Sequence, residues 1–189
     1  MAGLTPPITR RMTAEEFVLW AEAQPHGRYE LENGEVLVMP SERARHARVK
    51  SAAWAALRDA IGRANLPCEA FPDGMAVRID ERTVYEPDAL VRCGERLADD
   101  DIIVRDPMIV VEISSPSTAR RDGTTKLAGY LLLPSIRHYL IIDLEQEAAI
   151  HFSRPGGQSA ALTHILREGP IRLDPPGLQL DVAALLDPA

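Results

Sequence analysis

Two apolar runs joined by a helical stretch constrain the fold of this 189-residue chain more than any other feature. The runs are Met108–Ser114 and Arg137–Leu144, and both have strand length. Between them, the residues from about Arg121 to Leu133 have a helical pattern, which Pro134 ends. A helical crossover returns the second strand parallel to the first. The chain therefore predicts a mixed α/β sheet that helices cover.

The N-terminal part begins with a helix signal. Residues 1–12 look like a flexible leader, and Thr13 and Glu16 have the spacing of a capping box. The helix that this box opens should end before Pro25. We expect one domain over residues 13–189, with a core of about 28–153 and a C-terminal β extension over 154–189.

A hairpin should follow this helix. Asn33-Gly34 lies between two alternating runs, which is a strong signal for a two-residue turn. Such a turn pairs Glu32 with Glu35 and, two steps back, Glu30 with Leu37. Glu30 then faces away from Leu31, beside Leu37 and Met39, and should be partly desolvated; the alternative is a carboxylate on the surface of the strand.

The remaining elements follow from periodicity and turn residues. We expect Ser41 to cap a long helix that reaches about Ala64. The expected strands are Cys68–Phe71 and Met75–Ile79 as an antiparallel pair around Pro72-Asp73-Gly74, then Thr83–Val91, Ala148–Ser153, Ala160–Leu166 and Leu178–Val182.

Composition narrows the classes of function. There are 21 Lys and Arg against 28 Asp and Glu, so the formal net charge is −7, which argues against coating nucleic acid by charge alone. A local basic surface stays open, because positive residues gather on the long helix: Arg43, Arg45, Lys50 and Arg58.

The cysteines and the apolar runs indicate in which cellular compartment the protein is located. Cys68 and Cys93 form no CxxC motif, so we expect two small thiols rather than a zinc site or a disulfide framework. The first residues lack the apolar region of a secretion signal, and no apolar run approaches the roughly 18 residues that span a bilayer. We expect a cytoplasmic protein without a membrane contact.

Acids inside strands are the most informative candidates for chemistry. Asp88 lies in the run Val84–Val91, and Glu112 lies in Met108–Ser114. An ionised carboxylate in an apolar strand costs several kcal/mol unless it is paired or binds a metal. The structural alternative is an acid paired with an arginine. Pro87 also suggests a strand end at Asp88, where an acid can reach solvent.

Further candidates lie on helices. Asp122, Lys126 and Tyr130 are spaced i, i+4, i+8, so they share a stripe of the helix that follows Glu112. The alternative is a solvated ion pair. Carboxylates with a backbone carbonyl suit Mg²⁺ or Mn²⁺, and a nearby lysine can act on a water molecule, which is the equipment of metal-assisted phosphodiester hydrolysis. A glycosidase ranks lower, because Trp- and Tyr-rich stretches are missing.

In combination these motifs resemble one known family. The chain from about Met12 to Ala149 is similar to the Uma-two family of endonucleases, within the PD-(D/E)XK, restriction-endonuclease-like superfamily. The matching segments are Tyr29–Val36, His46, Glu86-Pro-Asp88, Pro107–Thr118, Arg121-Asp122, Lys126, Tyr130, Pro134 and Tyr139–Asp143. The resemblance implies a mixed central β-sheet flanked by helices, preceded by the N-terminal helix and hairpin.

The resemblance also implies roles for individual residues. Asp88 and Glu112 would hold Mg²⁺ or Mn²⁺, together with the backbone carbonyl of Ile113. The superfamily's lysine position is Ser114 here, and Lys126, with Tyr130 beside it, is the substitute. Glu30 matches a further acid that would bind the metal directly or through water. His46 matches a position near the substrate phosphate.

Three functions follow from this pattern. The first is a Mg²⁺-dependent endonuclease that hydrolyses DNA. The second is a nuclease fold that serves only as a binding or assembly module, which Ser114 and the net charge favour. The third is a metal-dependent hydrolase of RNA or nucleotides. Apolar residues in short, edge-prone C-terminal strands suggest a homodimer.

Overall fold

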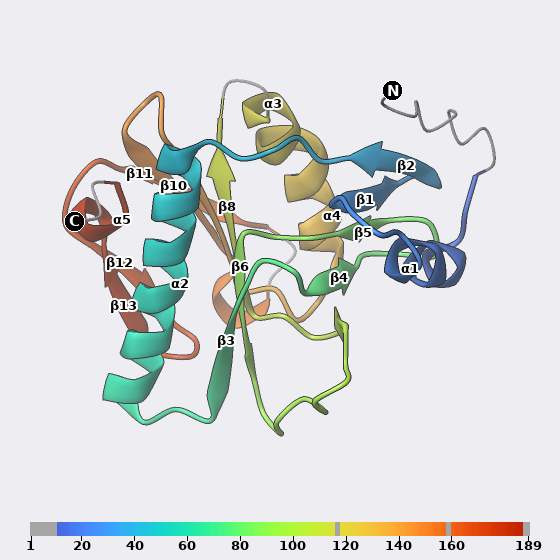
Figure 1. Ribbon diagram of the computed structural model, residues 1–189. Helices are drawn as coiled ribbons and strands as arrows, with labels where there is room; N and C mark the ends of the chain where they lie inside the picture. The colour runs from blue at the N-terminus through green and yellow to red at the C-terminus, as the bar shows by residue number, and fades with distance from the viewer. Residues whose placement is uncertain (1–10, 116–117, 158–159, 187–189) are drawn as a thin grey trace.

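The computed structural model describes residues 11–115, 118–157 and 160–186, as a mixed α/β fold (Figure 1). Only the last two residues of the expected leader lie in this range. The helical segments are α1 (Ala14–Glu22), α2 (Ala44–Ala64), α3 (Ala119–Arg121), the π-helical η1 (Asp122–Lys126), α4 (Leu127–Leu132), the 3₁₀ segment η2 (Pro155–Gly157) and α5 (Val182–Leu186).

A six-stranded sheet forms the centre, in the order β11-β10-β9-β8-β6-β3. Its strands are β3 (Cys68–Pro72), β6 (Ala89–Cys93), β8 (Ile109–Ser114), β9 (His138–Asp143), β10 (Ala148–Ser153) and β11 (Leu162–Leu166). β8 and β9 are parallel, as the helical crossover predicts, and every other pair in this sheet is antiparallel.

Two smaller sheets complete the fold. A five-stranded sheet has the order β2-β1-β5-β4-β7, and β12 pairs with β13. Their strands are β1 (Tyr29–Glu32), β2 (Glu35–Val38), β4 (Ala76–Arg78), β5 (Val84–Tyr85), β7 (Ile103–Val104), β12 (Pro170–Leu173) and β13 (Leu178–Asp181).

The two faces of the central sheet bury separate cores, because successive side chains of a strand point to opposite faces. Val111 and Leu140 lie in the core under α2, α5 and the β12–β13 hairpin. Val110 and Tyr139 lie in the core that contains Tyr130 of α4. The helices thus cover both faces, as expected.

Local signals predict the N-terminal structure correctly. The capping box of Thr13 and Glu16 is present at the start of α1. The hairpin has the expected register, with Glu32 opposite Glu35 and Glu30 opposite Leu37. The start of α2 differs from expectation: Arg43 is its N-cap residue, without a side-chain capping bond, so the cap predicted at Ser41 is wrong.

Two strand predictions in the middle of the chain are wrong. The expected strand Thr83–Val91 breaks at residues 86–88, because the chain leaves β5 in the small sheet and enters β6 in the central one. Pro87 has no N–H to continue a ladder. The strands on either side of Pro72-Asp73-Gly74 do not pair, since β3 pairs with β6 and β4 with β5.

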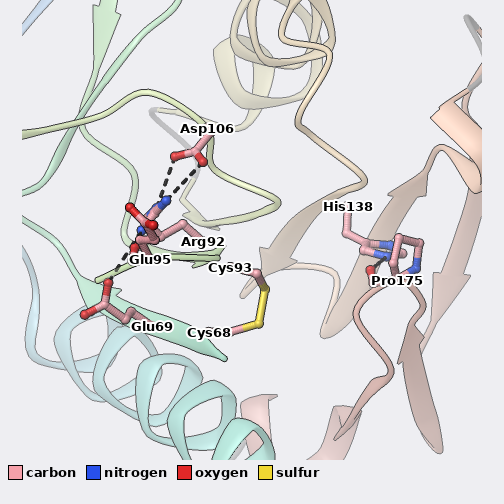
Figure 2. Close-up of a disulfide and its surroundings, with 8 residues drawn as sticks. All are labelled: Cys68, Glu69, Arg92, Cys93, Glu95, Asp106, His138 and Pro175. Carbon is pink, nitrogen blue, oxygen red and sulfur yellow. Dashed lines mark hydrogen bonds and ion pairs between the residues drawn. A yellow bond between two sulfur atoms is a disulfide. The ribbon is translucent and has the colours of Figure 1, made fainter. Parts of the chain in front are cut away.

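The expectation of two free thiols is also wrong, because Cys68 and Cys93 form a disulfide (Figure 2). The two residues are direct partners in the β3–β6 ladder, 25 positions apart in the chain. The number and spacing of the cysteines do not show which strands pair, so the sequence does not predict this disulfide. In the part of the chain that is described, no helix is long and apolar enough to cross a membrane.

Two helical glycines provide a test of the packing. A Cβ added to Gly129 in α4 would lie 2.9 Å from Cε2 of Tyr85, whereas one added to the exposed Gly62 in α2 meets nothing within 4 Å. We predict that Gly129→Ala lowers the free energy of unfolding by about 1–3 kcal/mol through overpacking. Gly62→Ala should raise it by about 0.5–1 kcal/mol through helix propensity. Urea unfolding measures both, and stabilisation by both variants would contradict the close packing of α4 against Tyr85.

Candidate active site

Strand register brings Asp88 and Glu112 together. β6 and β8 are antiparallel, with Ala89 opposite Val111, so the next position places Asp88 beside Glu112 at the end of β8. The Ile113 N–H donates to Asp88 Oδ2 at 2.7 Å. The pairing between β6 and β8 ends at Ala89, and the Asp88 carboxylate therefore contacts the end of β8.

Lys126 and Tyr130 approach Glu112 from the helical segment that follows β8. Lys126 Nζ donates to Glu112 Oε1 at 2.8 Å, and the Tyr130 hydroxyl donates to the same oxygen at 3.0 Å. Lys126 is the last residue of the π-helical turn η1, and Tyr130 lies in α4. Lys126 is 2% exposed and Glu112 4%. The solvated ion pair considered as an alternative does not describe this lysine.

Glu30 lies on the other side of Lys126 and is 0% exposed. Its Oε1 accepts from the Glu86 N–H at 3.0 Å and lies 2.9 Å from Lys126 Nζ. Its Oε2 accepts a hydrogen bond from Arg121. Both oxygens thus have partners, and Glu30 holds the lysine and the arginine in place.

His46 reaches the same strand end from α2. Its Nε2 lies 2.9 Å from the Ile113 carbonyl oxygen and 3.5 Å from Asp88 Oδ2. Because a carbonyl only accepts, Nε2 carries the proton in this arrangement. On the other side of the ring, Nδ1 lies 3.7 Å from Glu42 Oε2. The structure thus places His46 against the two groups that were expected to hold a metal.

Potential metal ligands meet at this point. One ligand atom from each of Glu42, His46 and Asp88 lies within 4.8 Å of the others. Glu42 was not among the candidates from the sequence, although its i, i+4 spacing from His46 is a signal that could have found it. Lys50, one turn beyond His46, donates to Glu42 and lies 4.0 Å from Asp88 Oδ1.

The acids of the site outnumber its cations, and burial shifts their ionisation. Burial raises the pKa of Glu112 to about 8, against the opposing effect of Lys126, and the nearby carboxylate of Asp88 adds to the rise. Burial also raises the pKa of Asp88 and of Asp122. Glu30 differs: burial would raise its pKa, but Lys126 and Arg121 hold it below its ordinary value.

Lys126 stays charged in these surroundings. Burial alone would lower the pKa of its ammonium, but the carboxylates of Glu112 and Glu30 outweigh that effect and raise it. The site therefore contains a permanent buried positive charge next to a carboxyl group that readily takes up a proton.

A cavity of about 380 Å³ opens onto these groups. Asp88, Glu112 and Lys126 contribute to its walls, and so do the Ser115 and Thr118 hydroxyl residues of the loop after β8. Several arginines also line it: Arg28, Arg43, Arg45 and Arg121. A solute in this cavity would meet both buried acids and arginines.

The fold and the site together define a mixed α/β protein with buried acids and a lysine gathered at one strand end. A crystal structure of a protein from Anabaena variabilis, titled a putative nuclease belonging to DUF820, has the same fold, with a TM-score of 0.72 and 16% identity over 93% of this chain and 97% of that one.

Residues 14–186 match the model of the Uma2 family, described as "Putative restriction endonuclease", so the chain belongs to this family. A curated relative, the uncharacterized protein sll1609 of Synechocystis sp., is 28% identical over 163 residues, which is 85% of this chain and 90% of that protein.

The raised pKa of Glu112 predicts a pH dependence of stability in metal-free buffer. In the unfolded chain the carboxyl ionises above its ordinary pKa of 4.5, whereas the folded protein retains the proton up to about pH 8. The wild type should therefore lose stability relative to Glu112→Gln as the pH rises through this window, by at most about 1.4 kcal/mol per pH unit.

Urea unfolding of both proteins at about pH 5, 6.5 and 8 measures this difference. The exposed Glu168→Gln serves as the control, and its difference from the wild type should stay constant over that window. A constant difference for Glu112→Gln as well would show that Glu112 ionises normally.

Proposed function

We propose that the protein is a metal-dependent endonuclease that hydrolyses phosphodiester bonds of DNA. The observation that carries this proposal is the arrangement of Asp88, Glu112 and Lys126 around one strand end, inside a cavity. Membership of the Uma2 family supports the same reaction class. The pKa of Glu112 supports a functional role too, since a carboxyl group that is costly to ionise gains most from a bound cation.

The donor set fits a divalent metal ion. The carboxylates of Asp88 and Glu112 and the carbonyl of Ile113 are oxygen ligands of the kind that Mg²⁺ and Mn²⁺ prefer. His46 brings a ring nitrogen to the same place. It would bind a metal through Nε2 in its other tautomer, with the proton on Nδ1 toward Glu42, so we assign it to the metal rather than to the substrate phosphate. Such an ion lowers the pKa of a bound water and offsets charge on the phosphate.

The surrounding residues position these groups. Lys126 holds a positive charge beside Glu112, where it offsets charge that develops on the phosphate and orients the attacking water. Glu30 has both oxygens engaged, so we assign it to positioning Lys126 and Arg121, and any contact with the metal would pass through water. Tyr130 orients the Glu112 carboxylate.

Ser114 explains why the lysine comes from a helix. It follows Glu112 by two residues, so both side chains lie on one face of β8. Ser114 is buried, and its hydroxyl has no hydrogen-bond partner among the described residues. The strand thus supplies no cation at this position, and Lys126 supplies it from η1.

Two functions other than DNA cleavage are each supported by a specific observation. Ser114 and the net charge of −7 favour a module that kept the fold without the chemistry. A hydrolase of RNA or nucleotides would use the same site, and a substrate panel separates it from a DNA endonuclease. We also propose that the protein forms a homodimer, whichever of these functions it has. The edge strand β11 exposes the apolar side chains of Leu162 and Ile165, which a second copy could cover.

Plasmid cleavage with Mg²⁺ or Mn²⁺ tests the reaction. We predict cleavage by the wild type and a reduction of about 10²–10⁴-fold in Asp88→Asn, Glu112→Gln and Lys126→Met, since each removes a group that acts on the reacting atoms. Glu168→Gln should cleave like the wild type. Cleavage that survives the first two substitutions would overturn the assignment.

Calorimetry with Mn²⁺ tests the metal separately from the reaction. We predict that the wild type binds Mn²⁺, that Asp88→Asn abolishes binding, and that His46→Ala weakens it by at least about tenfold, or 1.4 kcal/mol. Lys126→Met should retain binding, because it removes a cation and no ligand. Absence of binding in the wild type would support the module without chemistry.

A further inference from the structure

Arginines gather beside the candidate active site, on a surface that the proposed reaction does not use. Arg43, Arg45 and Arg48 lie at the start of α2, and Arg167 follows β11. All four side chains are exposed. We call this surface the arginine groove.

The arginine groove adjoins the cavity of the candidate active site. Arg43 and Arg45 line the cavity of about 380 Å³ that contains Asp88. Arg45 also lines a second hollow of about 600 Å³, together with Arg48 and Arg167. Figure 1 shows the start of α2 at the same end of the molecule as the end of β8 and α3. Because Arg45 lines both hollows, a chain-like ligand bound in one would reach the edge of the other.

Few acids lie beside the groove, and the one next to Arg43, Glu42, is already engaged by Arg28 and Lys50, although Glu145 also lines the cavity. The first turn of α2 contains no acid. Glu147 lies 3.6 Å from Arg45, and both side chains are largely exposed, so the pair is weak. Arg167 donates to the Gln146 carbonyl, which orients it without cancelling its charge. In the described residues, Arg43 and Arg48 make no ion pair.

We infer that the arginine groove binds the phosphate backbone of the nucleic-acid strand beyond the bond that is cut. This inference rests on the proposed function. Guanidinium groups bind phosphates bidentately, and several of them in a row suit a ligand with regularly repeated negative charge. Because the whole chain has a net charge of −7, such binding has to be local to this groove.

Fluorescence anisotropy with a short labelled DNA duplex tests the inference. The background is the full chain carrying Glu112→Gln, with Mg²⁺ present, so that binding is measured without cleavage. The test variant combines Arg45→Gln, Arg48→Gln and Arg167→Gln. A matched control of equal net charge combines Arg58→Gln, Arg63→Gln and Arg96→Gln, which change exposed arginines away from the groove.

The groove variant should bind at least about tenfold more weakly. The slope of log affinity against log salt, between about 50 and 200 mM, should become shallower by about 0.9 for each phosphate that the variant no longer neutralises. The control variant should keep the affinity and slope of the background protein. Glu147→Gln should change affinity in the opposite direction and bind more tightly, since it removes the acid beside Arg45.

Equal effects of the groove and control variants would overturn the inference, because charge alone would then explain them. Absence of duplex binding by the background protein would overturn it too, while Mn²⁺ binding and plasmid cleavage by the wild type would still support the proposed function. Groove-dependent binding without any cleavage by the wild type would support the inference and count against the proposed endonuclease.

Discussion

The ammonium group of Lys126 connects the parts of this protein. It lies between Glu30 of β1, in the five-stranded sheet, and Glu112 of β8, in the central sheet. A buried ammonium without such partners would cost several kcal/mol, so the two sheets and the helical segment η1 have to meet at one point. Arg121, which contacts Glu30 and Glu32, strengthens the same junction from the side of β1.

The junction has more negative than positive groups. Glu30, Asp88, Glu112 and Asp122 are all buried near two buried lysines, Lys126 and Lys50. The pKa of each acid is raised by burial except that of Glu30, which Lys126 and Arg121 hold below its ordinary value. A purely structural ion pair would need one acid for one base. The surplus costs stability, and surplus carboxylates around a cavity are typical of sites where a cation binds.

Local chemistry explains which features could be predicted from the sequence. The capping box at Thr13 and the turn at Asn33-Gly34 act over a few residues, so the helix start and the hairpin register were correct. The parallel β8–β9 pair followed from chain topology alone. The β3–β6 ladder, and with it the Cys68–Cys93 disulfide, depends on a long-range choice of partner that no short motif encodes.

In the candidate site, too, some residues can be predicted from local sequence and others only from contacts between distant segments. Glu112 was conspicuous because a lone acid in an apolar strand is expensive, and Lys126 because helical spacing places it on a stripe with Asp122. Glu42 and Arg121 are less conspicuous: Glu42 has only its i, i+4 spacing from His46, and Arg121 enters only through the family resemblance, since charged residues at helix starts are usually solvated. Their places in the site depend on contacts outside their own helices, with Arg28 for Glu42 and with Glu30 for Arg121.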